Sequence, residues 1–414
     1  MDEKVLVTDA SGYIALHIVN ILQSERYHVV ATVNSQEKAD KMANSFEHYY
    51  PYAVLDVIDA TSESAFEQVF EDHPDIQHVI HTAPTASAGT ESTTEASFLI
   101  PATEGTKNVL ESIKRHGQKV KTVVVTSSFA ALMDSENAAD PKCVISEKSW
   151  NPITWEEAKD KENRAYEASK KMAEQLAWKY YEESKGHLNF TLTTVNPPFV
   201  FGPHVFEWKL EVDEWNTTAL YIKKALELSA DDLGPFTKPC GICCDVRDAA
   251  LLHVLPLRNP SLAGKRLFPV NGTGLKQHSY EDGKFNLQRI INVLNATFPE
   301  LEGSLPVGSQ AENQSNLDKL TRYNNDETCS LTGMEFKSFA TTLRDAAVQI
   351  LKATSTLAPW HPGTLPERRR RACGHTLSGL SKPVRQCGSS LPWSRAAPQT
   401  LDSQSYARHE NPQK

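Results

Sequence analysis

The chain has 414 residues, of which 40% are hydrophobic and 23% charged, a composition typical of a globular protein with a large core. Its net charge of -9 is uneven, because residues 354–414 hold nine Lys/Arg against three Asp/Glu and the preceding residues therefore carry -15. An acidic body argues against nucleic acid as a partner. No apolar run approaches the roughly 20 residues needed to cross a bilayer, so we expect no membrane partner.

The seven cysteines are few and irregularly placed, which is typical of a reducing compartment. A strand-like run begins almost at the N-terminus, so we expect no signal peptide and a cytoplasmic location. Cys240, Cys243 and Cys244 could indicate zinc, but no second Cys/His pair stands at a useful spacing and a zinc site needs about four ligands. We therefore predict free thiols and no metal.

Short apolar runs alternate with helical patterns over residues 1–203. The expected strands are 4–8, 28–33, 52–57, 78–82, 121–126 and 190–195. The expected helices begin near Ile14 and continue at 63–71, 101–116 and 162–183. Such alternation predicts an α/β fold with a doubly wound parallel sheet, the Rossmann fold, in which ligands bind at the carboxyl ends of the strands.

The pattern loosens after Pro203. We expect residues 204–353 to form mainly a smaller substrate-binding lobe, with segments that cross back to the first domain. Its expected elements are helices at 217–229, 286–294 and 338–351, a strand at 242–246, and a polar loop or insertion at 271–286. Residues 354–414 contain seven Pro and show no periodicity, so we predict a disordered, basic, Pro-rich tail.

The turn after the first strand has the spacing of a dinucleotide fingerprint, with Asp9, Gly12 and Ala15 at its three small-residue positions. Gly12 lets the backbone approach a pyrophosphate at a helix N-terminus. Asp9 instead adds negative charge near that group. At about 5 Å and an effective dielectric near 20 the repulsion is roughly 3 kcal/mol, a hundredfold in affinity unless a cation or a proton compensates. Because Asp tolerates left-handed backbone angles, the turn itself should still form.

The end of the second strand indicates which cofactor is used. An Asp or Glu there would hold the ribose 2′-hydroxyl of NAD. This chain has Asn34, and Lys38 is available to a 2′-phosphate. The sequence therefore favours NADP, the alternative being that Lys38 is a solvated loop residue.

Two further patterns indicate proton chemistry. Tyr166 and Lys170 lie four residues apart on one face of a predicted helix. An ammonium beside a phenol favours the phenolate and lowers the tyrosine pKa, which gives a proton donor or acceptor near neutral pH. Ser127 and Ser128 end the most apolar strand, at the edge where sites form. Each pattern alone also fits a surface pair or a capping serine, whereas together they predict an active site.

In combination these motifs resemble those of the extended short-chain dehydrogenases/reductases. The chain is most similar to the fungal methylglyoxal and ketone reductases related to plant dihydroflavonol reductase, over about residues 5–353. The segments that carry the resemblance are VLVTDASGYIALHIV (5–19), NSQEKA (34–39), HTAP (81–84), LIPATEGTKNVLESIK (99–114), VVVTSSFAAL (123–132), YEASKK (166–171), TTVNPPFVFGP (193–203) and DVRDAA (245–250).

The resemblance implies a catalytic triad of Ser128, Tyr166 and Lys170. Tyr166 would protonate the carbonyl oxygen during hydride transfer, Ser128 would hydrogen-bond that oxygen, and Lys170 would lower the tyrosine pKa and hold the nicotinamide ribose. Ser128 is chosen over Ser127 because the second serine is the catalytic one in the family. Family members have glycine where this chain has Asp9 and commonly arginine where it has Asn34.

The resemblance also implies the residues that contact NADP. Beyond Tyr166 and Lys170, these are the pyrophosphate turn Asp9, Ala10, Ser11, Gly12, Tyr13 and Ile14, then Asn34 and Lys38 at the 2′-phosphate, Asp59 and Ala60 at the adenine, and Val200 and Thr218 at the nicotinamide end.

The leading hypothesis is an NADPH-dependent reductase of a small or medium ketone or aldehyde, with secondary metabolism as one setting, acting as a monomer or homodimer. One alternative is a dehydratase or epimerase acting on a nucleotide-linked sugar with the same scaffold. The other is a pseudoenzyme that has lost cofactor affinity through Asp9.

Overall fold

The computed structural model describes residues 3–46, 54–82, 94–206, 215–272 and 283–355. All of them belong to one compact unit, Met1–Gly374. Of the tail predicted to be disordered, residues 354–414, the first two end a helix, and residues 356–414 lie outside the described part, as do residues 273–282 of the expected insertion. Within the described residues, no helix is both long and apolar enough to cross a membrane.

The main sheet has seven parallel strands in the order β10-β7-β5-β4-β1-β2-β3. Its strands are β1 (Lys4–Thr8), β2 (His28–Val33), β3 (Val54–Val57), β4 (Ile76–Thr82), β5 (Thr122–Thr126), β7 (Thr191–Val195) and β10 (Arg266–Leu267). Strand order runs outward in opposite directions from β1 and β4. The predicted doubly wound parallel sheet is therefore confirmed, and its topological switch point lies between these two strands.

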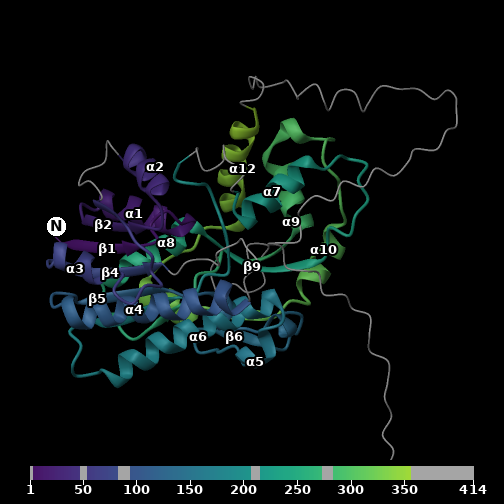
Figure 1. Cartoon of the computed structure of the whole chain (residues 1–414). Helices are drawn as coiled ribbons and strands as arrows, with labels where there is room; N and C mark the ends of the chain where they lie inside the picture. Colours follow the sequence, from purple (N-terminus) through teal and green to yellow (C-terminus); the bar gives the residue numbers. More distant parts are fainter. Residues whose placement is uncertain (1–2, 47–53, 83–93, 207–214, 273–282, 356–414) are drawn as a thin grey trace, which may run out of the picture. The chain divides into compact units, whose positions relative to one another are not determined.

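Helices cover both faces of this sheet (Figure 1). One face carries α1 (Tyr13–Ser24), α2 (Gln36–Phe46) and α8 (Val246–Val254). The other face carries α3 (Glu67–Asp72), α4 (Ile100–His116) and α6 (Glu162–Glu183). Because both faces are covered, the central strands are buried along nearly their whole length rather than at alternate residues.

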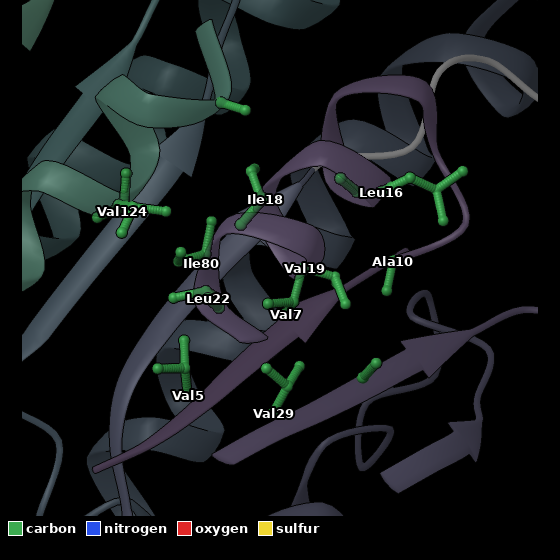
Figure 2. Packing of buried hydrophobic residues seen from close by; sticks show 14 of the residues in the cluster. Val5, Val7, Ala10, Leu16, Ile18, Val19, Leu22, Val29, Ile80 and Val124 are labelled. Carbon is green, nitrogen blue, oxygen red and sulfur yellow. The ribbon is translucent and has the colours of Figure 1, made fainter. Parts of the chain in front are cut away.

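Successive side chains of β1 show this double burial. Val5 and Val7 pack into the core on the α1 side, whereas Leu6 belongs to the core on the α4 side. Figure 2 shows Val5 and Val7 beside Val19 and Leu22, which recur on the inner face of α1. Each of these side chains is fully buried, and burying one contributes about 1.5–3 kcal/mol.

A smaller sheet, in the order β11-β9-β8, follows the Rossmann strands. It consists of β8 (Phe199–Phe201), β9 (Pro239–Asp245) and β11 (Lys284–Asn286). Helices α7 (Thr217–Glu227), α9 (Leu287–Thr297) and α12 (Phe339–Ser355) pack against it around Phe285. The remaining described α-helices and strands are α5 (Trp155–Ala158), α10 (Gln310–Leu317), α11 (Asp326–Thr332) and the parallel pair β6 (Val144–Ser146) and β12 (Arg322–Asn324).

The structure differs from the sequence-based expectation in three ways. The helix expected at 63–71 begins only at Glu67, after a series of turns. The stretch 271–286, expected to be a loop, ends in β11, whose three residues are too few for a periodic pattern. The described elements that were not predicted are helices α2, α5, α8, α10 and α11 and strands β6, β8, β10 and β12. Strand β10 follows residue 203 in the sequence and pairs in the main sheet, so this segment crosses back to the first domain. The domain boundary at residue 203 stays a prediction.

Gly202 offers a test of how the two sheets are joined. Its φ is 136°, and a Cβ there would come within 2.8 Å of Val246 Cγ1. We expect Gly202→Ala to lower the free energy of unfolding by about 2–4 kcal/mol, from backbone strain and overpacking. The control is Gly264→Ala, where φ is 72° but nothing lies within 4 Å of the added Cβ. Urea denaturation of both variants should show the smaller loss for Gly264→Ala, and equal losses would contradict the contact argument.

Candidate active site

Polar side chains connect the carboxyl ends of β1 and β4, at the switch point of the sheet. Thr8 Oγ1 lies 2.8 Å from His81 Nδ1 and accepts a hydrogen bond of 3.1 Å from the Thr82 backbone N–H. The Thr82 hydroxyl in turn donates to the Thr8 carbonyl. All three residues are buried. These bonds hold the main chain where it leaves β1 and enters the turn at residues 9–14, called the glycine turn below.

The glycine turn has the backbone that the sequence predicts. Asp9 adopts a φ of 46°, the left-handed conformation for which glycine is usual and Asp is tolerated. The Gly12 N–H donates to the Asp9 carbonyl over 3.1 Å, and α1 begins one residue later. Gly12 has no side chain to cap α1. The first N–H groups of that helix are thus suited to receive an anion such as a pyrophosphate.

The other members of the glycine turn are fixed by packing. Ala10 and Ser11 are buried, and the Ala10 N–H donates to the Thr32 carbonyl over 2.8 Å. The Tyr13 hydroxyl donates to the Gly202 carbonyl over 2.6 Å, and Ile14 packs against the core. Tyr13 and Ile14 therefore face the protein, so any contact they make with a cofactor would come from their backbone.

Ser128 and Tyr166 form the centre of the site. Ser128 lies two residues beyond the end of β5, and its Oγ accepts a hydrogen bond of 3.1 Å from the Ala130 N–H. The Ser128 side chain also acts on the Tyr166 phenol, whose pKa it lowers. Helix α6 supplies Tyr166 and, one turn later, Lys170, whose Nζ lies 5.7 Å from the centre of the tyrosine ring.

Tyr166 differs from expectation in the direction of its pKa. Burial raises the pKa of Tyr166 above its ordinary value and outweighs the lowering by the Ser128 hydrogen bond. Lys170 does not lower it in this structure, so the expected effect of the ammonium on the phenol is wrong here. A raised pKa keeps Tyr166 neutral at neutral pH, which is the form that can donate a proton.

Lys170 is the cation that faces the Asp9 carboxylate. Its side chain is only 5% exposed. Burial lowers the pKa of Lys170 to about 8, and the negative charge of Asp9 opposes that shift. The compensating cation that Asp9 requires is therefore present, and it comes from the predicted catalytic helix.

The remaining predicted cofactor residues lie in three separate places. Lys38 Nζ donates to Asn34 Oδ1 over 2.9 Å, just after the carboxyl end of β2. Asp59 and Ala60 follow β3, the neighbour of β2 in the sheet, so they lie at the same edge. Thr218, at the start of α7, donates to the Val200 carbonyl over 2.5 Å in the smaller sheet. One cation beside an amide suits a 2′-phosphate better than a ribose hydroxyl.

Three polar residues of this region were not predicted as part of the site. Glu174 lies one turn beyond Lys170 on α6, Asn196 follows the end of β7, and His81 is the next-to-last residue of β4. Burial, with a smaller contribution from the charge of Lys170, lowers the pKa of His81 to about 3, so its ring is neutral. The spacing of Glu174 from Lys170 was the one available signal, since both lie on one helix face.

The cysteines give no sign of a metal centre in the described residues. Cys240, Cys243 and Cys244 are free thiols there. No group of three or more His, Cys, Asp or Glu side chains within the described ranges could hold a metal ion.

The fold and this cluster define a Rossmann-type oxidoreductase of the short-chain dehydrogenase/reductase kind. The sheet, its switch point and the glycine turn supply a dinucleotide site, and Ser128, Tyr166 and Lys170 meet at the neighbouring strand end. The chain belongs to the NAD dependent epimerase/dehydratase family, whose family model matches residues 5–263.

This chain matches similar proteins over nearly their whole length. The NADPH-dependent methylglyoxal reductase GRE2 of Saccharomyces cerevisiae is 35% identical over 352 residues, 84% of this chain and 98% of that protein. The ketoreductase azaE of Aspergillus niger is 32% identical over 363 residues, 84% and 98% of the two chains. The crystal structure of yeast methylglyoxal/isovaleraldehyde reductase Gre2 complexed with NADPH has a TM-score of 0.77 at 34% identity, covering 85% of this chain and 99% of that one. The predicted family, fold and oxidoreductase class are confirmed.

The lowered pKa of Lys170 predicts a dependence of stability on pH. An unfolded lysine has a pKa of about 10.4, so between pH 8 and that value the unfolded state binds more protons and stability rises with pH. Burying the charged side chain thus costs up to about 3 kcal/mol below pH 8. We expect Lys170→Met to be more stable than the native protein near pH 7, with the difference shrinking towards pH 10.

Urea denaturation of both proteins at about pH 7 and about pH 9.5 measures this difference. The other titrating groups cancel in the comparison. A stability difference between the two proteins that does not change with pH would mean that Lys170 keeps an ordinary pKa.

Proposed function

We propose that the chain is an NADPH-dependent carbonyl reductase that acts on a small or medium ketone or aldehyde. One observation carries the proposal: Lys170 Nζ lies 5.7 Å from the centre of the Tyr166 ring and the Ser128 side chain acts on the same phenol, at the carboxyl edge of the sheet that also bears the glycine turn. The similarity to NADPH-dependent reductases along almost their whole length supports the same assignment.

The residues present fit NADPH. The glycine turn and the uncapped start of α1 would hold the pyrophosphate, and Lys38 with Asn34 would hold the 2′-phosphate. Asp59 and Ala60 would border the adenine, and Val200 and Thr218 the nicotinamide end. When bound, NADPH supplies the hydride for reduction of the carbonyl carbon.

The side chains of this protein would supply the proton. Tyr166, neutral because of its raised pKa, donates its phenolic proton to the carbonyl oxygen. Ser128, whose acceptor side is occupied by the Ala130 N–H, donates a hydrogen bond to the same oxygen and polarises the carbonyl. Lys170, one turn further along α6, would hold the nicotinamide ribose.

The finer features of the hypothesis belong to this proposal as well. They are a cytoplasmic location, a monomer or homodimer, and a setting in secondary metabolism. A dehydratase or epimerase reaction would use the same scaffold, but GRE2 and azaE, which the chain matches over almost their whole length, are reductases.

Replacing the proton donor tests the proposal directly. We expect Tyr166→Phe to lower kcat for reduction of methylglyoxal or isovaleraldehyde by about 100- to 10,000-fold, because the phenolic proton is lost. NADPH binding, followed by fluorescence titration, should change little. Turnover that persists in Tyr166→Phe would exclude Tyr166 as the donor.

Asp9 favours a second candidate, a scaffold with impaired cofactor affinity. Its carboxylate lies in the turn that would hold the pyrophosphate, although Lys170 partly compensates the charge. We expect Asp9→Gly and Asp9→Asn each to tighten NADPH binding by about 10- to 100-fold in a fluorescence titration. Asn keeps the side-chain size and tolerates the left-handed backbone, so the pair separates charge from shape.

Micromolar binding of NADPH by the native protein would remove the impaired-scaffold hypothesis. If only Asp9→Gly gains affinity, bulk rather than charge is the obstacle. If neither variant gains affinity, the Asp9 carboxylate does not oppose the cofactor.

A further inference from the structure

Glu174 is a buried carboxylate directly behind the proposed active site. Its side chain is fully buried, and six hydrogen-bond donors surround its two oxygens. Arg266 binds in two places, with Nε 2.6 Å from Oε1 and Nη2 3.1 Å from Oε2. The other donors are the Ser127 hydroxyl (2.6 Å), the Asn196 amide (2.7 Å), the Thr194 hydroxyl (2.9 Å) and the Trp178 indole (3.2 Å).

This carboxylate is charged in the folded protein. Burial alone would raise the pKa of Glu174, but the hydrogen bonds and charge of Arg266, with those from Ser127 and Asn196, hold it below its ordinary value. Arg266 is itself held in place, because its guanidinium packs 3.8 Å from the centre of the Trp150 ring and donates to two backbone carbonyls. Glu174 is therefore a fixed anion.

The position of Glu174 on α6 ties it to the site. It follows Lys170 by four residues and Tyr166 by eight, so all three lie along one face of the helix. The same helix face thus carries the proposed proton donor, the ammonium and the buried carboxylate.

The opposite side of the network leads to Ser128. Asn196 uses its two amide N–H groups for two acceptors, Glu174 Oε2 at 2.7 Å and the Ser128 carbonyl at 3.2 Å. Ser127, the residue before Ser128, donates its hydroxyl to the same carboxylate oxygen and its backbone N–H to the Val195 carbonyl. The backbone of Ser128 is therefore connected to α6 through Glu174 on both sides.

We propose that Glu174 and Asn196 act as positioning residues for the Ser128 hydroxyl, an inference that rests on the proposed reductase function. Both side chains are buried and hydrogen-bonded to other protein groups. They fix the distance between the end of β5 and the face of α6, and hence the position of Ser128 relative to Tyr166. A displacement of about 1 Å at such a site can cost a hundredfold in rate.

The sharpest test is a matched pair within the network. Ser127→Ala and Thr194→Val each remove one hydroxyl that donates to Glu174, at 2.6 Å and 2.9 Å, and both residues are buried. Only Ser127 adjoins Ser128. We expect Ser127→Ala to lower kcat by about 3- to 10-fold and Thr194→Val by less than about twofold, with similar losses in melting temperature.

Glu174→Gln gives the larger effect. We expect kcat to fall by about 10- to 100-fold, while the KM for methylglyoxal and the Kd for NADPH stay within about threefold. Asp248→Asn is the control for loss of a buried carboxylate. Asp248 is 2% exposed and binds Lys337 instead, so this variant should lose melting temperature and keep kcat.

The native protein is assayed first, with NADPH and methylglyoxal or isovaleraldehyde. Absence of turnover in the native protein contradicts the proposed function itself. An active native protein with unchanged kcat in Glu174→Gln overturns the positioning role alone. If Glu174→Gln does not fold, the matched pair decides: equal kcat in Ser127→Ala and Thr194→Val shows a merely structural network, and a selective loss in Ser127→Ala supports the inference.

Discussion

The register of the parallel strands is the constraint on which the rest of the site depends. Thr8 pairs with His81, Thr82 with Thr126, and Thr126 with Val195, so β1, β4, β5 and β7 end along one row. The residues that follow β1, β5 and β7 must then be neighbours, whatever their separation in the sequence. The turn at Asp9, the serines after β5 and the amide of Asn196 meet at one edge for this reason, and α6 lies across that edge with Tyr166 and Lys170.

Much of this arrangement could be predicted from local sequence. Strands β1, β2 and β5 are mainly apolar because helices cover both faces, and such runs indicate buried parallel strands without any structural knowledge. Tyr166 and Lys170 share a helix face by spacing alone, and that prediction holds in α6. The left-handed backbone of Asp9 also follows from the residue type and its place after a strand.

What the sequence could not supply are the partners that come from far away in the chain. Nothing in the local sequence around Glu174 sets it apart from other helix residues. Its role depends on hydrogen bonds from Arg266 in β10 and from Asn196 after β7, which are distant in the sequence. The predicted lowering of the Tyr166 pKa was wrong for the same reason. Spacing places Lys170 near the phenol, but the balance between burial and charge depends on everything packed around the ring. Short strands such as β11 exist because β9 pairs with them, and three residues carry no periodic signal.

Two carboxylates, Glu174 and Asp9, act on the proposed site. They differ in how strongly the folded protein determines their surroundings. Glu174 is satisfied by six donors, so the geometry of Ser128 is set by the folded protein alone, as preorganised catalysis requires. Asp9 is half-buried and faces Lys170, so its effect depends on what else is charged nearby. The same charge that opposes a diphosphate also helps to keep Lys170 protonated.

An intact Ser128, Tyr166 and Lys170 cluster is therefore not by itself proof of tight cofactor binding. The network around Glu174 would preserve that cluster in a protein that binds NADPH poorly, because none of its bonds involves the glycine turn. Catalytic geometry and cofactor affinity are set at two different places in this chain. The first is fixed by buried hydrogen bonds within the α6 side of the sheet, and the second is decided by the electrostatics of a single half-buried turn residue, Asp9.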